Sequence, residues 1–345
     1  MRVEDYLDKE AMHYYDKPND DRLSAQLLQK KYDMIDNKDN KYMATQKWDG
    51  YWMMFVRGEG NDSNACFIRG RNMNKQGCYE NYGLKLPHLV EEMLKWPENT
   101  VVLGEVCWPQ LNKVATDVGV ILRCLPEKAI ARQSQSKLIV KAFDILCLRG
   151  EDLGSKVGYK CRYNTLKSFC SFYKSDYIDV TNVCYDDFMG FADSIIGQGG
   201  EGCVIQLCDN LYEYGKRSAW HTLKLKQHLD TATYPVLGFL NPTREYSGKE
   251  ADTWEYKDED GTLVTKPYAL KWKVGVTIGL PSGHTCDVSS GLTDADREWA
   301  SSDEAQSLLQ DGKLFVNVRA MQEATLGGLR HPVFEGWEFD KDVQR

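Results

Sequence analysis

The sequence predicts an α+β protein of two domains, in which antiparallel sheets with flanking helices are followed by a small β-barrel. Strand-like runs with interspersed helical runs fill the first two thirds of the chain. After Lys226 the pattern changes to short β-runs separated by turn-rich stretches. A chain of 345 residues is long enough for two separate cores. We therefore expect one domain over residues 1–231 and a second over residues 232–345.

The first domain is predicted to begin its sheets at residues 41–57, KYMATQKWDGYWMMFVR. Two β-runs flank an Asp-Gly turn there, a pattern typical of a β-hairpin. Apolar residues at three- and four-residue spacing predict a helix over 87–96, and a second helix is predicted over 163–173. Further strands are predicted at 66–69, 101–107, 138–148, 202–207 and 221–226.

The second domain is predicted from three β-runs at 234–239, 268–280 and 314–321. Turn-rich stretches such as NPTREYSGKE and KDEDG separate them. Short strands at this spacing over roughly a hundred residues fit a small β-barrel.

Composition excludes several classes of protein. With 42% hydrophobic and 27% charged residues, the chain is neither disordered nor collagen-like. It has no apolar run near the ~18 residues of a membrane span, and acidic residues near its start argue against a signal peptide. Eleven cysteines without a CxxC pair are expected to be buried or partly buried free thiols in a cytoplasmic protein. The net charge of −8 does not exclude a polyanionic partner, because an average hides local basic surface.

Two residues at predicted strand ends are candidates for chemistry. Lys47 stands directly before the turn formed by Asp49 and Gly50, so a rigid edge would project its amine. Taken alone, it could equally be a solvated hairpin lysine. Glu105 closes the apolar run VVLGE, where a carboxylate marks either a pocket rim or a strand end that reaches water.

A third candidate is Glu201, inside GQGGEGCVIQL. Gly197, Gly199 and Gly202 match the letters of the GxGxxG dinucleotide fingerprint. That fingerprint requires a following helix, whereas CVIQL is strand-like, which argues against a Rossmann fold. What remains is a turn that delivers Glu201 to the start of a strand.

Lys224 and Lys226 would share one face of a strand, because alternate residues point the same way. They either protect an exposed edge strand or line a pocket for a polyanion. Phe143, in AFDIL, is either a core residue or a flat surface for a nucleotide base. Each signal is weak alone, but in order they provide a lysine nucleophile, two carboxylates for a metal, an aromatic platform and two cations.

This order resembles the covalent nucleotidyltransferase superfamily of ATP-dependent DNA ligases, RNA ligases and mRNA capping enzymes. KWDG resembles its nucleophile motif, FIRGRN its arginine segment, and LGEV, AFDIL, EGCVI and LKLK the motifs that follow. YEYGKRS resembles the ligase lead-in to the last of these. Residues 273–293 and 325–334 resemble the oligonucleotide-binding barrel of small phage DNA ligases. The resemblance implies an adenylation domain followed by an OB-fold barrel.

The resemblance also implies a mechanism. Lys47 would attack ATP to form a lysyl-AMP, and AMP would then pass to the 5′-phosphate of nicked double-stranded DNA before a 3′-hydroxyl displaces it. Glu105 and Glu201 would hold Mg²⁺ or Mn²⁺, which prefer oxygen ligands. Phe143 would stack on adenine, Arg71 would contact the nucleotide, Asp49 would shape the turn, and Lys224 and Lys226 would neutralise phosphate charge and help to deprotonate Lys47. The enzyme is expected to act as a monomer in DNA repair, replication or recombination.

Two positions depart from the family pattern. DNA ligases usually carry arginine two residues after the motif glycine, where this chain has Trp52. Arg57 and Arg69 are candidates to replace it. The last family motif, Arg-x-Asp-Lys, keeps only its second half in Glu338-Phe339-Asp340-Lys341.

Three other functions remain open from the sequence. An RNA ligase and a capping guanylyltransferase share the nucleophile motif, and the barrel resemblance favours a DNA ligase over both. A non-catalytic nucleic-acid-binding barrel protein with a decayed transferase domain would fit Trp52 and Glu338. The complete set of lysines and glutamates argues against decay.

Overall fold

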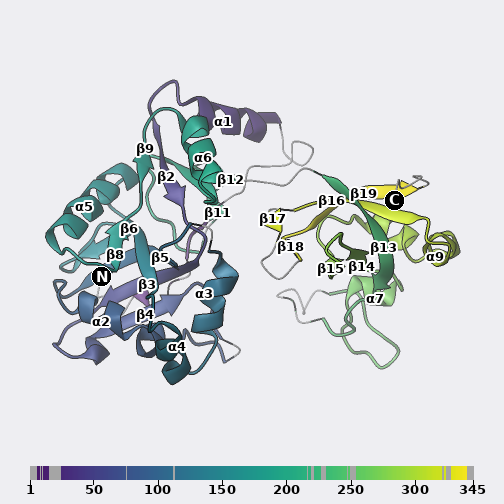
Figure 1. Cartoon of the computed structure of the whole chain (residues 1–345), viewed down its shortest axis with the longest axis horizontal. Coiled ribbons are helices and arrows are strands. Elements are labelled where there is room, and N and C mark those ends of the chain that lie inside the picture. Colours follow the sequence, from purple (N-terminus) through teal and green to yellow (C-terminus); the bar gives the residue numbers. More distant parts are fainter. Residues whose placement is uncertain are drawn as a thin grey trace. The chain divides into compact units, whose positions relative to one another are not determined.

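The computed structural model describes residues 6–7, 9, 11–14, 25–74, 76–111, 113–215, 217–218, 221–226, 231–246, 248, 254–320, 322–323 and 328–339. The chain divides into two compact units, Met1–Lys226 and Gln227–Arg345 (Figure 1). The predicted domain boundary, between residues 231 and 232, lies a few residues after this division.

The first unit is built on two sheets that are mainly antiparallel. The larger has the strand order β4-β3-β5-β6-β7, with β8 pairing β6, and the smaller has the order β12-β10-β2-β9. The strands of the larger sheet are β3 (Tyr51–Arg57), β4 (Cys66–Gly70), β5 (Thr100–Cys107), β6 (Ile139–Leu148), β7 (Glu151–Asp152) and β8 (Ile178–Val180). Those of the smaller sheet are β2 (Tyr42–Lys47), β9 (Val183–Cys184), β10 (Gly202–Leu207) and β12 (Thr222–Lys226), while β1 (His13–Tyr14) pairs β11 (Arg217–Ser218) separately.

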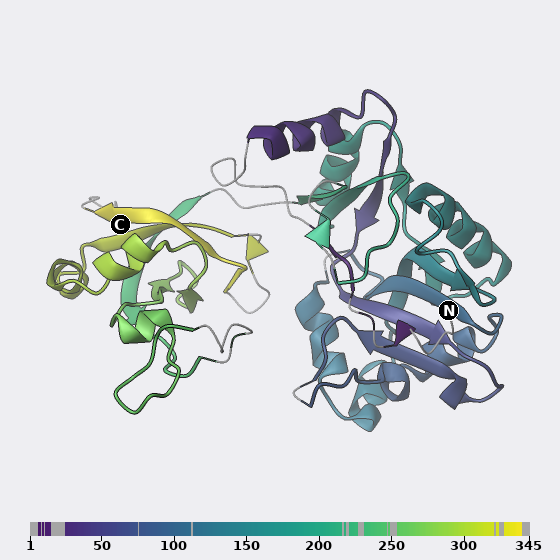
Figure 2. The ribbon, with the colours of Figure 1, turned by 180° about the vertical axis from the view of Figure 1, so that it is seen from behind.

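Helices cover one face of each sheet, as Figures 1 and 2 show. Apolar residues of α2, α3, α4 and α5 form a core with the larger sheet. Those of α1 and α6 pack against the smaller sheet around its buried leucines and isoleucine. The bounds are α1 (Ala25–Asp36), α2 (Pro87–Met93), α3 (Ala115–Leu122), α4 (Pro126–Arg132), α5 (Tyr159–Phe172) and α6 (Phe188–Gly197), with short 3₁₀ helices at Ser63–Ala65 and Tyr82–Lys85.

The predicted hairpin over residues 41–57 is wrong, although both of its strands exist. β2 pairs with β10 and β9, whereas β3 pairs with β4 and β5 in the other sheet. The segment 48–50 therefore crosses between the sheets instead of folding one strand back on the other. Long-range pairing outweighs the local turn preference here, because β2 makes six cross-strand pairs with β10.

The second unit contains a five-stranded antiparallel sheet of order β15-β14-β13-β16-β19 around its own core. In the residues that the structure describes, β15 and β19 are not paired as strands, so the sheet is not a closed barrel. An isolated bridge nevertheless joins Ser290, two residues after β15, to Val333 of β19. Its strands are β13 (Ala232–Leu240), β14 (Gly275–Gly279), β15 (Thr285–Val288), β16 (Leu314–Arg319) and β19 (Val333–Phe339), beside the pair β17 (Gln322–Glu323) and β18 (Leu329–Arg330). Its helices are α7 (Lys266–Ala269), α8 (Asp294–Trp299) and α9 (Asp303–Gln310).

Several other elements differ from their predictions. The predicted strand over 268–280 is half wrong, because α7 ends at Ala269 and β14 begins only at Gly275. Thr265 caps α7 and accepts a hydrogen bond from the Tyr268 amide, which favours a helical turn over an extended run. All eleven cysteines are free thiols, as predicted, but Cys78 and Cys161 are exposed rather than buried.

Candidate active site

Lys47 lies at the point where the chain crosses from one sheet to the other. It is the last residue of β2, and β3 begins four residues later. At Gly50 a Cβ atom would lie 2.1 Å from the carbonyl oxygen of Val106, so only glycine allows the crossing to pass so close to β5. Asp49 Oδ1 accepts a hydrogen bond from the amide of Ala115 at 3.2 Å, which ties the crossing to the first turn of α3.

The Lys47 amine pairs with a carboxylate that the sequence analysis had singled out. Lys47 Nζ donates to Glu201 Oε2 at 2.5 Å, and the two side chains are 21% and 7% exposed. Glu201 directly precedes β10, whose first residue is Gly202. Gly202 has a φ of +127°, and a Cβ atom at this position would lie 2.1 Å from the Leu225 carbonyl oxygen. Glycine at 202 therefore lets the strand begin there with Glu201 beside Lys47.

Both lysines of the LKLK strand face the same side of the sheet as Lys47. Gly202 pairs with Lys47 on one side and Lys226 on the other, and Val204 pairs in the same way with Thr45 and Lys224. Directly paired residues share a face, so Lys47, Lys224 and Lys226 lie on the same face of the smaller sheet. The intervening leucines of β12 are buried in the core on the opposite face. β12 is at the edge of its sheet, as the alternative interpretation predicted, so edge position and pocket position are compatible.

Glu105 comes from the opposite sheet to the same place. It pairs directly with Trp52 on β3 and with Lys141 on β6. Burial raises the pKa of Glu105 to about 7; the nearby Lys47 and Arg71 charges oppose this rise, and the Glu201 carboxylate adds to it. Glu105 is thus close to half-protonated at neutral pH and would become a stronger acceptor if a cation approached.

The electrostatic balance at Lys47 differs from the expectation. Burial alone lowers the pKa of the amine, but the carboxylates of Glu201, Glu105 and Asp49 outweigh it, and the pKa is raised above its ordinary value. In the protein without nucleotide, Lys47 is therefore an ammonium held in an ion pair. In this state the charges of Glu201, Glu105 and Asp49 keep the Lys47 amine protonated, so the expected help from Lys224 and Lys226 in its deprotonation is not seen.

Arg71 lies on the Glu105 side and next to the position where the family pattern fails. Its guanidinium is 5.4 Å from the centre of the Trp52 ring, within the range of a cation–π contact. Arg57 and Arg69, the residues suggested as replacements, are both buried. Arg57 donates to the carbonyls of Gly58 and Gly60. Arg69 donates to the carbonyls of Tyr6 and Lys9 in the N-terminal segment and of Gly70 in β4. Both guanidinium groups thus make contacts that support the fold.

Phe143 is half-buried and packs against the apolar cluster that contains Trp52. It sits at a β-bulge: Leu103 pairs with Asp144 and Gly104 with Ala142, which leaves Phe143 as the extra residue. Bulges re-aim side chains and are frequent next to active sites. A Cβ at Gly104 would lie 2.5 Å from Val140, so this glycine of the LGEV motif allows β5 and β6 to approach closely.

One residue of this region was missed by the sequence analysis. Lys141 shares the face of Glu105, lies 5.1 Å from the centre of the Trp48 ring and pairs with Asp179 at 3.4 Å. Lys141 lies two residues before Phe143 in the predicted strand, and alternate residues of a strand share a face, so the sequence could have identified it. Two residues of the expected motifs, Asp340 and Lys341, lie outside the described residues.

The donor groups of this site suit a cation that also binds phosphate. Among the described residues, no group of three or more His, Cys, Asp or Glu side chains forms a complete metal site. Magnesium commonly takes only one or two protein carboxylates, with water and substrate phosphates completing its ligands. The pair Glu105 and Glu201 matches that partial, oxygen-only donor set.

Comparison with known proteins agrees with this arrangement. A family model described as "ATP dependent DNA ligase domain" matches residues 22–226, more than half of the chain. The chain therefore belongs to the ATP-dependent DNA ligase domain family. Among curated protein sequences, none matches significantly.

Solved structures show the same fold. One described as "Pmar-Lig_PreS3" has a TM-score of 0.64 and 18% identity, and the match covers 95% of this chain and 67% of that one. A structure from a study of Lig E DNA ligases has a TM-score of 0.61 and 14% identity, and the match covers 95% of this chain and 99% of that one.

Within the described part of the chain, no helix combines the length and apolarity needed to cross a bilayer.

Proposed function

We propose that this protein seals nicks in duplex DNA, with ATP as the AMP donor and Lys47 as the nucleophile. The observation that supports this best is the convergence of Lys47, Glu201 and Glu105 from two different sheets, with a 2.5 Å contact between the first two. A lysine that only increased solubility would be exposed, whereas the Lys47 side chain is 21% exposed and lies beside two carboxylates.

In the first step, Lys47 Nζ attacks the α-phosphorus of ATP. A P–N bond forms, the bond to the β-phosphate oxygen breaks, and pyrophosphate leaves. A lysine amine can do this only when neutral, so the ammonium proton must leave first. Glu201 Oε2 already accepts the hydrogen bond from Nζ and is the nearest group placed to take that proton.

The same side chains manage the charge of the triphosphate. Lys224 and Lys226 lie on the face of Lys47, where they would offset negative charge that builds on the phosphoryl oxygens. A divalent cation held by Glu105 and Glu201 would supply further charge neutralisation. Arg71, held against Trp52, would contact the nucleotide, and Phe143 would offer its ring to adenine.

The later steps transfer AMP to DNA and release it. The 5′-phosphate of the nick displaces Lys47 from AMP, and the adjacent 3′-hydroxyl then displaces AMP to form the phosphodiester bond. We propose that the second unit is an OB-fold that binds the duplex, which its five-stranded antiparallel sheet supports. Asp49, bound to the start of α3, would keep the nucleophile at the crossing.

The test is covalent labelling with ATP carrying a labelled α-phosphate. Wild-type protein should retain one label, and Lys47→Ala and Lys47→Arg should retain none, since a guanidinium stays protonated. Lys41→Ala is the matched control, because Lys41 directly precedes the same strand and its side chain is 62% exposed. Label retained by Lys47→Ala would contradict the proposal.

Two further arms separate the related functions. GTP in place of ATP should give no label, whereas a capping enzyme would prefer GTP. Nicked duplex DNA should be sealed and nicked duplex RNA should not. Labelling without sealing of either substrate would leave an adenylating protein that is not a ligase.

A further inference from the structure

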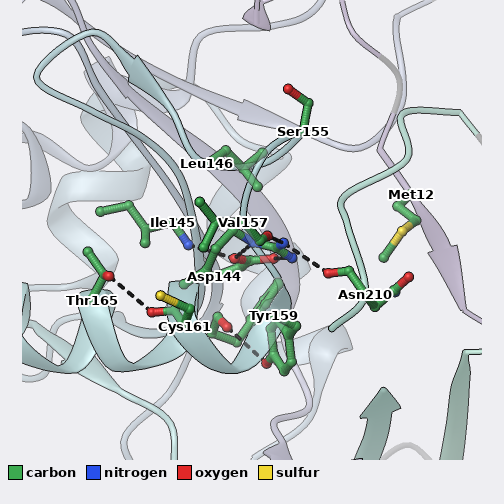
Figure 3. Close-up of polar contacts among 12 residues, drawn as sticks. Met12, Asp144, Ile145, Leu146, Ser155, Val157, Tyr159, Cys161, Thr165 and Asn210 are labelled. Carbon is green, nitrogen blue, oxygen red and sulfur yellow. Dashed lines mark hydrogen bonds and ion pairs between the residues drawn. The ribbon is translucent and has the colours of Figure 1, made fainter. Parts of the chain in front are cut away.

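Tyr159 occupies an unusual position between the two sheets of the first unit. It is the first residue of α5 and is completely buried. With Met43, Tyr163 and Cys208 it forms a small separate core beneath the inner face of the smaller sheet. Figure 3 shows Tyr159 beside Asp144 and Val157, with Asn210 across from them.

The Tyr159 side chain links strands that belong to different sheets. Its hydroxyl donates to the main-chain carbonyl of Phe143 on β6 at 3.0 Å. Its ring packs in one buried cluster with Met43 of β2. Met43 is four residues before Lys47 and on the same face of β2, so a single side chain joins the nucleophile strand to the bulge that carries Phe143.

A buried ion pair holds the other side of that bulge. Asp144 and Arg162 are both fully buried and make a two-point contact, with Arg162 Nε on Asp144 Oδ1 at 2.8 Å and Arg162 Nη2 on Asp144 Oδ2 at 2.9 Å. The remaining nitrogen of Arg162 donates to the carbonyls of Val157 and Asn210. Asp144 Oδ1 also accepts from the Ile145 amide.

This network adds to the cross-strand hydrogen bonds that hold β6 in its sheet. A continuous strand is held by its ladder, but a bulge interrupts the ladder and leaves the extra residue without a paired partner. Fully satisfied buried polar networks specify one local geometry. Here the network holds the backbone at the Phe143 carbonyl and at Asp144, and the packing of Tyr159 on Met43 relates it to the strand of Lys47.

We propose that Tyr159 is a positioning residue that sets the placement of the Phe143 ring relative to Lys47, and so governs binding of the nucleotide base. This inference rests on the proposed function. In this proposal Tyr159 touches neither the nucleotide nor the reacting atoms, and it acts only through Phe143 and Met43.

The experiment is a double-mutant cycle on covalent adenylation of Lys47. Tyr159→Phe should raise the ATP concentration at half-maximal rate about tenfold, with the maximal rate within twofold of wild type, because the base loses its platform while the phosphates do not. In a Phe143→Leu background, the same Tyr159→Phe change should alter that concentration less than twofold. Such non-additivity is expected only when the two residues act together.

Tyr6→Phe is the matched control, because Tyr6 is an equally buried tyrosine whose hydroxyl bonds to Asp152 at 3.1 Å and Leu146 at 3.4 Å. It should lower the melting temperature about as much as Tyr159→Phe without changing ATP dependence. Additive effects of Tyr159→Phe and Phe143→Leu, or equal effects of the two tyrosine variants on ATP dependence, would overturn the inference. Absence of label in the wild-type protein would instead refute the proposed function.

Discussion

The two sheets of the first unit contribute to the candidate site in opposite ways. The smaller sheet supplies side chains with charged ends, Lys47, Lys224 and Lys226, held largely by electrostatic contacts such as the pair with Glu201. The larger sheet supplies Phe143, whose backbone is fixed by a buried network. The proposed nucleophile is thus held by charge pairs, while the backbone of the proposed base platform is held by buried hydrogen bonds. Substitutions on the first side should affect chemistry, and those on the second should affect stability and binding.

The largest effect is expected at Asp144. Asp144→Asn leaves the fully buried Arg162 guanidinium without its carboxylate, which should lower the free energy of unfolding by about 3–5 kcal/mol. Urea unfolding of the whole chain measures this, and Asp39→Asn, in an exposed pair with Lys41, should leave the midpoint unchanged. A small change in the free energy of unfolding for Asp144→Asn would mean that the buried ion pair does not stabilise the larger sheet, and the contrast between the two sheets would fail.

Glu201 tests the other side of the comparison. Glu201→Gln should slow adenylation of Lys47 by about 100-fold or more, because it removes the proposed proton acceptor and one of the two proposed metal ligands. The melting temperature should change little, since the amide can still accept a hydrogen bond from Nζ. Glu80→Gln breaks another 2.5 Å pair, with Lys85, and should leave adenylation unaffected. Strong destabilisation by Glu201→Gln would show that the charged side is also structural.

Gly202 is expected to matter through geometry alone. In Gly202→Ala, the new side chain would stand on a backbone with a φ of +127°, and its Cβ would lie 2.1 Å from the Leu225 carbonyl oxygen. The substitution should therefore lower the free energy of unfolding by about 2 kcal/mol and displace β12 with its lysines. Gly197→Ala, in the same glycine-rich segment, meets nothing within 4 Å and should be neutral. Denaturant unfolding and adenylation rates of the two variants are to be compared directly, and equal behaviour would contradict this account.

Lys31 gives the smallest effect and refines the comparison, because it is a buried charge behind the smaller sheet. Its amine donates to the Thr222 carbonyl at 2.9 Å, and burial lowers its pKa from 10.5 to about 8. Between these pH values the unfolded chain binds the extra proton, so stability should rise with pH. Relative to Lys31→Met, the wild type should gain about 1.4 kcal/mol for each pH unit within this range. Parallel unfolding curves for the two proteins would contradict the assignment.

Much of the local structure follows from the sequence. The strands at 101–107, 138–148, 202–207 and 221–226 were predicted within one residue of β5, β6, β10 and β12, because β-branched and apolar runs bounded by turns leave few alternatives. The dinucleotide fingerprint was excluded for the same reason, since a strand follows Glu201. By contrast, the order of the strands in the second sheet depends on pairing that a local pattern does not contain. The cap of α7 at Thr265 is a local signal, and the prediction of a strand over 268–280 overlooked it.

The residue types needed for the chemistry, and their alternation along each strand, were therefore set by the sequence alone. Which strands pair was decided only by the tertiary structure: the apparent hairpin at Asp49-Gly50 became a crossing because β2 pairs with β10, more than 150 residues further along. Pairing across such a separation depends on the burial of whole faces, which no short window records. The same crossing brings Lys47 to the carboxylates of Glu201 and Glu105.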